Sequence, residues 1–207
     1  MTAAATSPSI AGGNVYDKYG SRNPVERRLV RGFLDELESL VIGTGAREVH
    51  EVGCGEGELL RRLARRGLHA RGSDISADVI DEAGRRARAA QLDIAFRVAS
   101  LEALDPGEDS AELILCCEVI EHVGDPRAAL EIVARLASPW AIVSVPREPL
   151  WRFLNLGRLR YVRELGNTPG HLQHWSRPSF IGFLEQRLEV VAVRSPLPWT
   201  MALCRSE

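Results

Sequence analysis

Residues 51–60 read EVGCGEGELL, and this stretch decides the fold because it joins a strand to a helix through three glycines. Val52 ends an apolar run before the glycines, and Leu59 begins a helical pattern after them. Glycine at such a junction permits a left-handed backbone and lets a ligand approach the main chain closely. The stretch therefore predicts a ligand site at the end of a buried strand.

The composition favours one soluble enzyme-sized domain. A chain of 207 residues with 45% hydrophobic content can bury one substantial core. Its 26 Lys and Arg against 28 Asp and Glu give a net charge of −2, which lacks the basic footprint expected for nucleic acid or an anionic membrane. The four cysteines include no C-x-x-C pair, which fits a reducing cytoplasm. We expect a cytoplasmic monomer or homodimer that acts on a small molecule.

The chain divides into a short leading segment and one domain. Residues 1–13 are small and polar without a basic or apolar signal region, so we expect a disordered lead. Residues 14–207 form the expected domain, with 14–45 as an N-terminal cap and helix. Residues 148–176 carry aromatic side chains among arginines and are interpreted as a substrate lid. An amphipathic helix with a solvated basic face explains the same composition.

Strand and helix patterns alternate along the domain. Asn23, Pro24 and Glu26 predict the N-terminus of a helix that Gly43 ends. Further helices are expected at about 57–66, after a Ser76 cap, and from Pro126. The expected strands lie at about 47–52, 69–73, 94–98, 111–117 and 139–145. The alternation predicts an α/β fold with a mostly parallel sheet, closed by an antiparallel hairpin of Leu188–Val193 and Thr200–Cys204.

The glycine spacing argues against a dinucleotide. Glu58 stands where the fingerprint G-x-G-x-x-G needs its third glycine, and Glu56 adds a second carboxylate that opposes a diphosphate. Asp74 follows at the end of the second expected strand, where a carboxylate can accept hydrogen bonds from ribose hydroxyls. Two other interpretations remain. The glycines can simply form a tight turn that binds no ligand, and Asp74 can serve as a helix cap.

The motifs EVGCGEG, GSDIS, CCEVIEHV and VSVPREP resemble those of class I S-adenosylmethionine-dependent methyltransferases, particularly the type 11 or ubiquinone-type group. The resemblance runs from about Val49 to Cys204. It implies a single Rossmann-like methyltransferase domain with a mostly parallel seven-stranded sheet and a C-terminal antiparallel hairpin. It also implies S-adenosylmethionine as the cofactor.

The resemblance implies roles for the cofactor-binding residues. Glu51 would hold the methionine ammonium, the glycine turn would admit the cofactor, and Asp74 would bind the ribose. The family usually carries Gly-Asp-Ala after the third strand, whereas this chain has Ala99-Ser100-Leu101, so Ser100 or backbone atoms would contact the adenine and Leu101 would pack on it. The expected cofactor-binding residues are Glu51, Gly53, Cys54, Gly55, Gly57, Asp74, Ile75, Ser100, Leu101, Cys117, Tyr16 and Tyr19.

An E-x-x-E-H motif at the end of the fourth strand suggests acceptor chemistry. On a helical turn, Glu118, Glu121 and His122 would share one face, where two carboxylates and an imidazole can bind a divalent ion. The motif resembles the magnesium or manganese site of the 2′-O-methyltransferases of small RNA ends, and similar residues occur in ubiquinone-pathway O-methyltransferases. In the former a histidine stands four residues before a tryptophan, which selects His171 before Trp175 as the fourth ligand, with His174 in reserve.

Other interpretations of these residues stay open. His122 can pack under the site and bond to the backbone, and without a metal either His122 or His171 can be the base. The expected catalytic residues are His122, His171 and Glu121. The expected function is methylation of a small-molecule acceptor, on oxygen rather than on nitrogen or carbon. The alternatives are an RNA 3′-end 2′-O-methyltransferase, against which the net charge argues, and a noncatalytic cofactor-binding module.

Overall fold

The computed structural model describes residues 23–157, 167–168 and 170–206, and within them seven strands form one sheet in the order β3-β2-β1-β4-β5-β7-β6. Strands β1 to β5 are parallel, and β7 runs antiparallel to both β5 and β6. The strands are β1 (Glu48–Val52), β2 (His69–Asp74), β3 (Ile94–Val98), β4 (Ala111–Cys117), β5 (Ala137–Pro146), β6 (Glu189–Arg194) and β7 (Trp199–Arg205). The predicted Rossmann-like sheet and its closing hairpin are confirmed.

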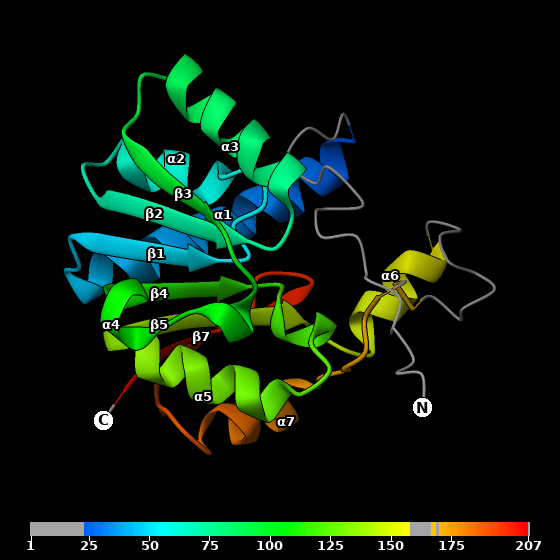
Figure 1. Cartoon of the computed structure of the whole chain (residues 1–207). Coiled ribbons are helices and arrows are strands. Elements are labelled where there is room, and N and C mark those ends of the chain that lie inside the picture. Colours follow the sequence, from blue (N-terminus) through cyan, green and yellow to red (C-terminus); the bar gives the residue numbers. More distant parts are fainter. Residues whose placement is uncertain (1–22, 158–166, 169, 207) are drawn as a thin grey trace, which may run out of the picture.

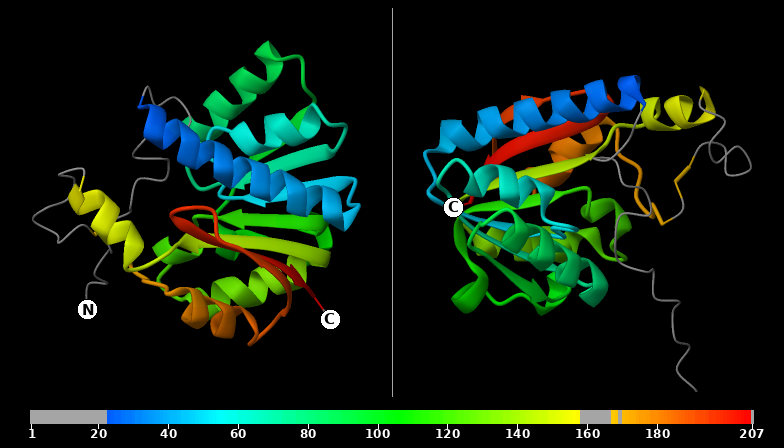
Figure 2. Two further views of the ribbon diagram at one scale, coloured as in Figure 1. Left: turned by 180° about the vertical axis from the view of Figure 1, so that it is seen from behind. Right: turned by 90° about the horizontal axis from the view of Figure 1, so that it is seen from above.

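Helices cover both faces of the sheet. Figure 1 shows α5 along one side and α1 on the other, and α6 beyond the carboxyl ends of the parallel strands. The view from behind in Figure 2 places α1 across the sheet. The described helices are α1 (Pro24–Thr44), α2 (Glu58–Ala64), α3 (Ala77–Ala89), α4 (Pro106–Asp109), α5 (Pro126–Leu136), α6 (Leu150–Gly157) and α7 (Arg177–Leu184), with 3₁₀ turns η1 (Leu101–Ala103) and η2 (Ile120–His122).

Two apolar cores lie on opposite faces of the sheet. One core joins α5 and α7 to the sheet and contains Leu130, Val133 and Phe180. The other joins α1 and α2 to the opposite face and contains Leu37 and Leu60. Burial of these side chains provides the main stabilisation of the fold, at about 1.5–3 kcal/mol for each large apolar side chain. The strand order changes direction between β1 and β4, and such a switch point is where parallel α/β sheets bind ligands.

The caps of α1 differ in part from the prediction. The Asn23 side chain accepts a hydrogen bond from Val25 N, so the predicted N-cap is confirmed. The predicted end at Gly43 is wrong, because the helix continues to Thr44. Gly45 caps it in the left-handed conformation, with φ 68°, and donates its N–H to Ile42 O. A left-handed C-cap explains why the second glycine, rather than the first, ends the helix.

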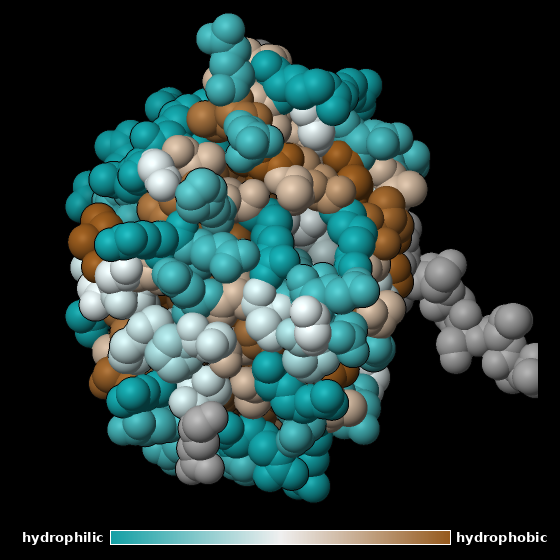
Figure 3. All heavy atoms as spheres, turned by 60° about the vertical axis from the view of Figure 1, so that its left-hand side comes forward, coloured by the Kyte–Doolittle hydropathy of each residue, from teal (hydrophilic) through white to brown (hydrophobic). Residues whose placement is uncertain are grey.

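The surface is largely hydrophilic, as a chain with 26% charged residues leads one to expect. On the face in Figure 3, hydrophilic side chains predominate and hydrophobic atoms gather in separate patches. Among the helices that the structure describes, none is long and apolar enough to span a bilayer. All four cysteines lie within the described residues, where they are buried and free of disulfide bonds.

Candidate active site

The glycine turn after β1 has the conformation that its sequence predicts. Gly53, Gly55 and Gly57 have φ of 70°, 53° and 70°, a region that side-chain-bearing residues rarely adopt. A Cβ at Gly53 would lie 2.4 Å from a methyl carbon of Val119, and one at Gly57 would lie 2.9 Å from the ring of Phe96. The turn therefore requires glycine both for its backbone and for its close packing.

Asp74 connects this turn to the end of β2. Its Oδ2 accepts a hydrogen bond from Gly55 N at 3.0 Å, and its Oδ1 accepts one from Ser76 N at 3.0 Å. Each carboxylate oxygen can accept a second bond, so the buried Asp74 can hold the turn and still receive a ligand hydroxyl. Ser76 stands at the N-cap of α3, as predicted, although its side chain makes no capping bond.

The other predicted cofactor residues surround the same strand ends. Glu51 and Cys54 are buried, and burial, with the charges of Glu51 and Asp74, raises the pKa of the Cys54 thiol well above its usual range. Ile75, which follows Asp74, is 60% exposed and free to cover a ligand.

The predicted adenine contacts lie at η1. Ser100 precedes this turn without making a side-chain capping bond, and Leu101 is buried in the core beside α5. Cys117 is buried at the end of β4. Tyr16 and Tyr19 lie outside the described residues.

Glu118 takes a different position from the one predicted. Its φ of 61° is left-handed, and η2 begins only at Ile120, so Glu118 does not share a helical turn with Glu121 and His122. Its Oε2 accepts from Trp199 Nε1 at 2.7 Å and its Oε1 from Ser144 Oγ at 3.3 Å. The carboxylate thus joins β4 to β5 and β7, and the predicted one-face arrangement is wrong.

Glu121, His122 and His171 come together at the end of β4. One potential ligand atom from each lies within 4.8 Å of the other two, and Glu121 is almost fully buried. The carbonyl oxygen of Glu121 accepts hydrogen bonds from Leu172 N at 2.8 Å and Gln173 N at 3.1 Å. These bonds hold the segment around His171 against η2.

Two features set the chemistry of the imidazoles. His122 Nδ1 lies 2.9 Å from the carbonyl oxygen of Gly170, which only accepts, so Nδ1 donates and the neutral ring keeps its lone pair on Nε2. Burial, followed by the charges of His122 and His174, lowers the pKa of His171 to about 3. His171 is therefore neutral near pH 7, with a lone pair available.

Tryptophans border this cluster. The Trp151 ring stacks on His171 with centroids 6.2 Å apart, and its Nε1 donates to Thr168 Oγ1 at 2.9 Å. The ring centroids of Trp199 and Trp151 lie 5.9 Å apart. His174 Nδ1 lies 3.7 Å from Glu148 Oε1, and His171 rather than His174 belongs to the cluster. Trp199 was not predicted as a site residue, because its place depends on β7 pairing with β5 rather than on a local motif.

Comparison with known proteins points to one family. Residues 49–140 match the family model described as a methyltransferase domain. The ubiquinone biosynthesis O-methyltransferase of Alkalilimnicola ehrlichii is 32% identical over 151 residues, 70% of this chain and 61% of the relative. The protein of the same name from Methylococcus capsulatus is 39% identical over 100 residues, 47% of this chain and 41% of the relative. The chain thus spans about two fifths to three fifths of these relatives.

A solved structure shares the fold. Magnesium protoporphyrin IX methyltransferase from Synechocystis PCC 6803, solved with bound S-adenosylhomocysteine, superposes with a TM-score of 0.71 at 20% identity, covering 91% of this chain and 89% of that one. This likeness extends across the sheet and the helices on both faces. The solved structure shows the shared fold, and the family match over residues 49–140 with the 32% identity to the Alkalilimnicola relative identifies the chain as a member of the class I S-adenosylmethionine-dependent methyltransferase family.

Proposed function

We propose that this chain binds S-adenosylmethionine at the ends of β1 and β2 and transfers its methyl group to an oxygen of a small-molecule acceptor. The observation that carries the proposal is the hydrogen bond of 3.0 Å from Gly55 N to Asp74 Oδ2. It fixes a carboxylate beside a glycine turn at the switch point of the sheet, where a nucleoside can meet both groups. The family match over residues 49–140 supports the same assignment.

The residues divide into a donor side and an acceptor side. Asp74 would accept bonds from the ribose hydroxyls, the buried carboxylate of Glu51 would face the methionine ammonium, and Ile75 would cover the adenine. In the transfer, the sulfur–methyl bond breaks as the oxygen–methyl bond forms, so alignment of the acceptor supplies much of the rate enhancement. Glu121, His122 and His171, at the end of β4, would provide that alignment because β4 is adjacent to β1.

The acceptor-side cluster fits a divalent cation. One carboxylate and two imidazoles lie close enough to share an ion, and the bond from His122 to Gly170 O leaves Nε2 as the ligand atom. Glu121, His122 and His171 would hold magnesium or manganese, which supplies a Lewis acid that lowers the pKa of the acceptor hydroxyl. Without a cation, a neutral imidazole of this cluster would take the hydroxyl proton as transfer proceeds.

The surroundings of the cluster favour an aromatic acceptor. Trp151 offers an aromatic ring face beside His171, Trp199 packs next to Trp151, and a three-ligand cation would keep open positions for substrate oxygens. A ring with two adjacent hydroxyls would use both features. The names of the two ubiquinone-pathway relatives agree with an oxygen acceptor.

The test is transfer of a labelled methyl group. The full chain is incubated with methyl-labelled S-adenosylmethionine and, separately, with catechol, a small-molecule cell extract and a short RNA, and the products are identified by mass. We expect label on an oxygen of the small molecules, with loss on Glu121→Gln or His171→Gln and no change on Glu131→Gln, a surface control on α5. Label on RNA alone would refute the acceptor class, and cofactor binding without any transfer would favour a binding module.

A further inference from the structure

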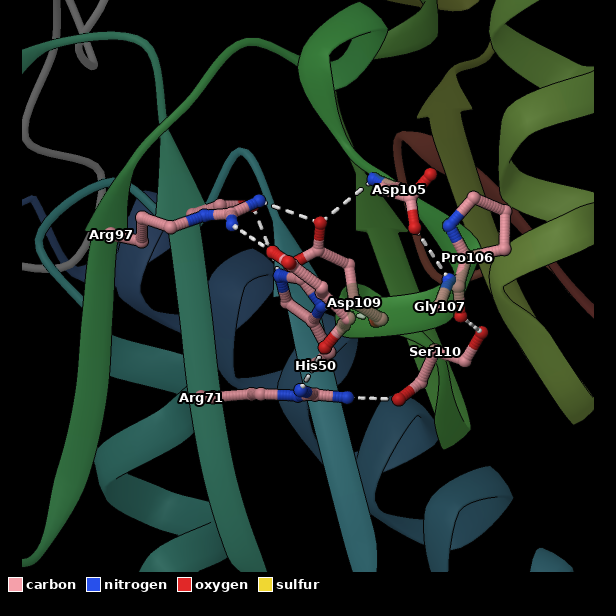
Figure 4. Close-up of polar contacts among 10 residues, drawn as sticks. His50, Arg71, Arg97, Asp105, Pro106, Gly107, Asp109 and Ser110 are labelled. Atoms are coloured by element: carbon pink, nitrogen blue, oxygen red, sulfur yellow. Dashed lines mark hydrogen bonds and ion pairs between the residues drawn. The ribbon is translucent and has the colours of Figure 1, made fainter.

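A polar network joins β1, β2 and β3 to the four-residue helix α4, which covers one face of these strands (Figure 4). Its centre is His50, in β1, which is 3% exposed. Arg71 donates to the carbonyl oxygens of Glu108, at 2.9 Å, and Ser110. Arg97 Nη2 contacts the Asp109 carboxylate at 2.6 Å. Arg71 thus bonds to carbonyl groups at the C-terminus of α4, and Arg97 pairs with the side chain of its last residue.

His50 links this network to β2 through one defined pair of bonds. Its Nδ1 lies 2.8 Å from the carbonyl oxygen of Asp109, which only accepts, so Nδ1 is the donor. In the neutral ring Nε2 then carries the lone pair and accepts from the Ser73 hydroxyl at 3.0 Å. His50 therefore orients the hydroxyl group of Ser73.

Ser73 in turn holds the glycine turn. Its carbonyl oxygen accepts hydrogen bonds from Gly53 N at 2.8 Å and from Cys54 N at 3.0 Å. The next residue is Asp74, whose carboxylate bonds to Gly55 N. Ser73 therefore connects the polar network around His50 to the two groups that bond to the turn, the Ser73 carbonyl and the Asp74 carboxylate.

We propose that His50 is a positioning residue for the cofactor turn and that it acts through the Nε2 bond to Ser73. The bond fixes the end of β2, so that the Ser73 carbonyl and the Asp74 carboxylate meet the N–H groups of the turn before a nucleoside arrives. His50 itself is buried, and its ring nitrogens bond to Asp109 and Ser73, so it would act on the cofactor only through Ser73. The inference rests on the proposed function, because it concerns the affinity of that same site.

The electrostatic surroundings keep the ring in the required form. Burial is the largest cause that lowers the pKa of His50, and the Arg71 and Arg97 charges lower it further, against the opposing effects of the Asp109 carbonyl and carboxylate. Glu48 and Glu108 reach Arg71 and Arg97 at 3.3 and 3.7 Å, so these arginines are themselves paired. A neutral His50 retains the lone pair that accepts from Ser73.

Two substitutions separate the two bonds of His50. In His50→Gln the amide reaches the place of Nε2, which retains the Ser73 bond and loses the one to Asp109. In His50→Asn the shorter amide takes the place of Nδ1, which retains the Asp109 bond and loses the one to Ser73. Ser73→Ala removes the same bond from the other side and leaves His50 with Asp109.

The measurement is calorimetric binding of S-adenosylhomocysteine to the full chain, beside its urea unfolding. We expect His50→Asn and Ser73→Ala to weaken binding roughly three- to tenfold, the loss of one hydrogen bond. His50→Gln should bind within about twofold of the wild type although it unfolds more easily, because affinity follows the Ser73 bond.

The possible results separate a failure of the proposed role of His50 from a failure of the proposed cofactor binding. If affinity falls in His50→Gln and is retained in His50→Asn, or if Ser73→Ala binds like the wild type, His50 merely stabilises the fold and the inference is wrong. If His50→Gln does not fold, His50→Asn and Ser73→Ala still decide between these results. If the wild type itself does not bind S-adenosylhomocysteine, the proposed function fails together with the inference.

Discussion

His122 donates from Nδ1 to the carbonyl oxygen of Gly170 at 2.9 Å, which joins two parts of the chain separated by 48 residues. The bond orients the imidazole and directs Nε2 away from the backbone. The neighbouring carbonyl of Glu121 accepts from Leu172 N and Gln173 N, so the same two segments are connected three times. Three hydrogen bonds to main-chain carbonyl oxygens therefore hold the acceptor-side cluster together.

The first prediction concerns the cation. Manganese binding to the full chain, followed by calorimetry or electron paramagnetic resonance, should show one site that Glu121→Gln or His171→Gln weakens at least tenfold, the usual scale for loss of metal-site interactions. Glu118→Gln should change the affinity little, because both Glu118 oxygens already accept bonds from Ser144 and Trp199. Equal losses for Glu118→Gln and Glu121→Gln would instead support the four-residue site inferred from the motif.

The second prediction concerns Asp74. Replacement by Ala removes the acceptor of Gly55 N and the expected acceptor of the ribose hydroxyls. Binding of S-adenosylhomocysteine should weaken by about 1–3 kcal/mol, the cost of leaving such partners unsatisfied. Asp78→Ala, on the exposed first turn of α3, is the matched control and should bind normally. Unchanged binding by Asp74→Ala would remove Asp74 from the site.

The third prediction concerns the packing of Gly53. Gly53→Ala should lower the free energy of unfolding by about 1–2 kcal/mol for the left-handed backbone, with about 1–3 kcal/mol more for the contact with Val119. Val119→Ala should cost less in the Gly53→Ala background than in the wild type, because it removes the methyl group that the new Cβ meets. Additive effects of the two substitutions in urea unfolding would show that this contact is absent.

The fourth prediction concerns pH. The pKa of His50 is lowered from its ordinary 6.5, so protons bind the unfolded chain more readily than the folded one. The stability from His50 is therefore complete above about pH 6.5 and declines as the pH falls toward the folded pKa, by at most about 1.4 kcal/mol per pH unit.

Urea unfolding at several pH values measures this effect. His50→Gln should show a shallower decline than the wild type between pH 7 and pH 5. Parallel curves for the wild type and His50→Gln would mean that the folded ring takes up a proton as readily as the unfolded one.

Local patterns predicted much of this molecule. The glycine turn, the alternation of strands and helices, and the closing hairpin all follow from spacing and residue type. The spacing of His171 before Trp175 also indicated the histidine that lies beside Glu121 and His122, although its role in the site stays a prediction. These features depend on neighbours in sequence, which is why sequence patterns indicate them.

Features that depend on sheet order could not be predicted in the same way. The left-handed Glu118 has no local signal, since its carboxylate is held by Trp199, 81 residues later. His50, Arg71 and Arg97 stand on three separate strands, and only the order β3-β2-β1 brings them together. The polar network around His50 therefore could not be predicted without the pairing of these strands.

The most direct test of the account is a calorimetric titration of the wild-type chain with S-adenosylhomocysteine and, separately, with NAD. Glu58 stands where a dinucleotide turn needs its third glycine, while Asp74 suits a ribose. The account predicts one S-adenosylhomocysteine bound per chain and no measurable NAD binding at the same concentrations. Equal binding of the two, or none of S-adenosylhomocysteine, would contradict it.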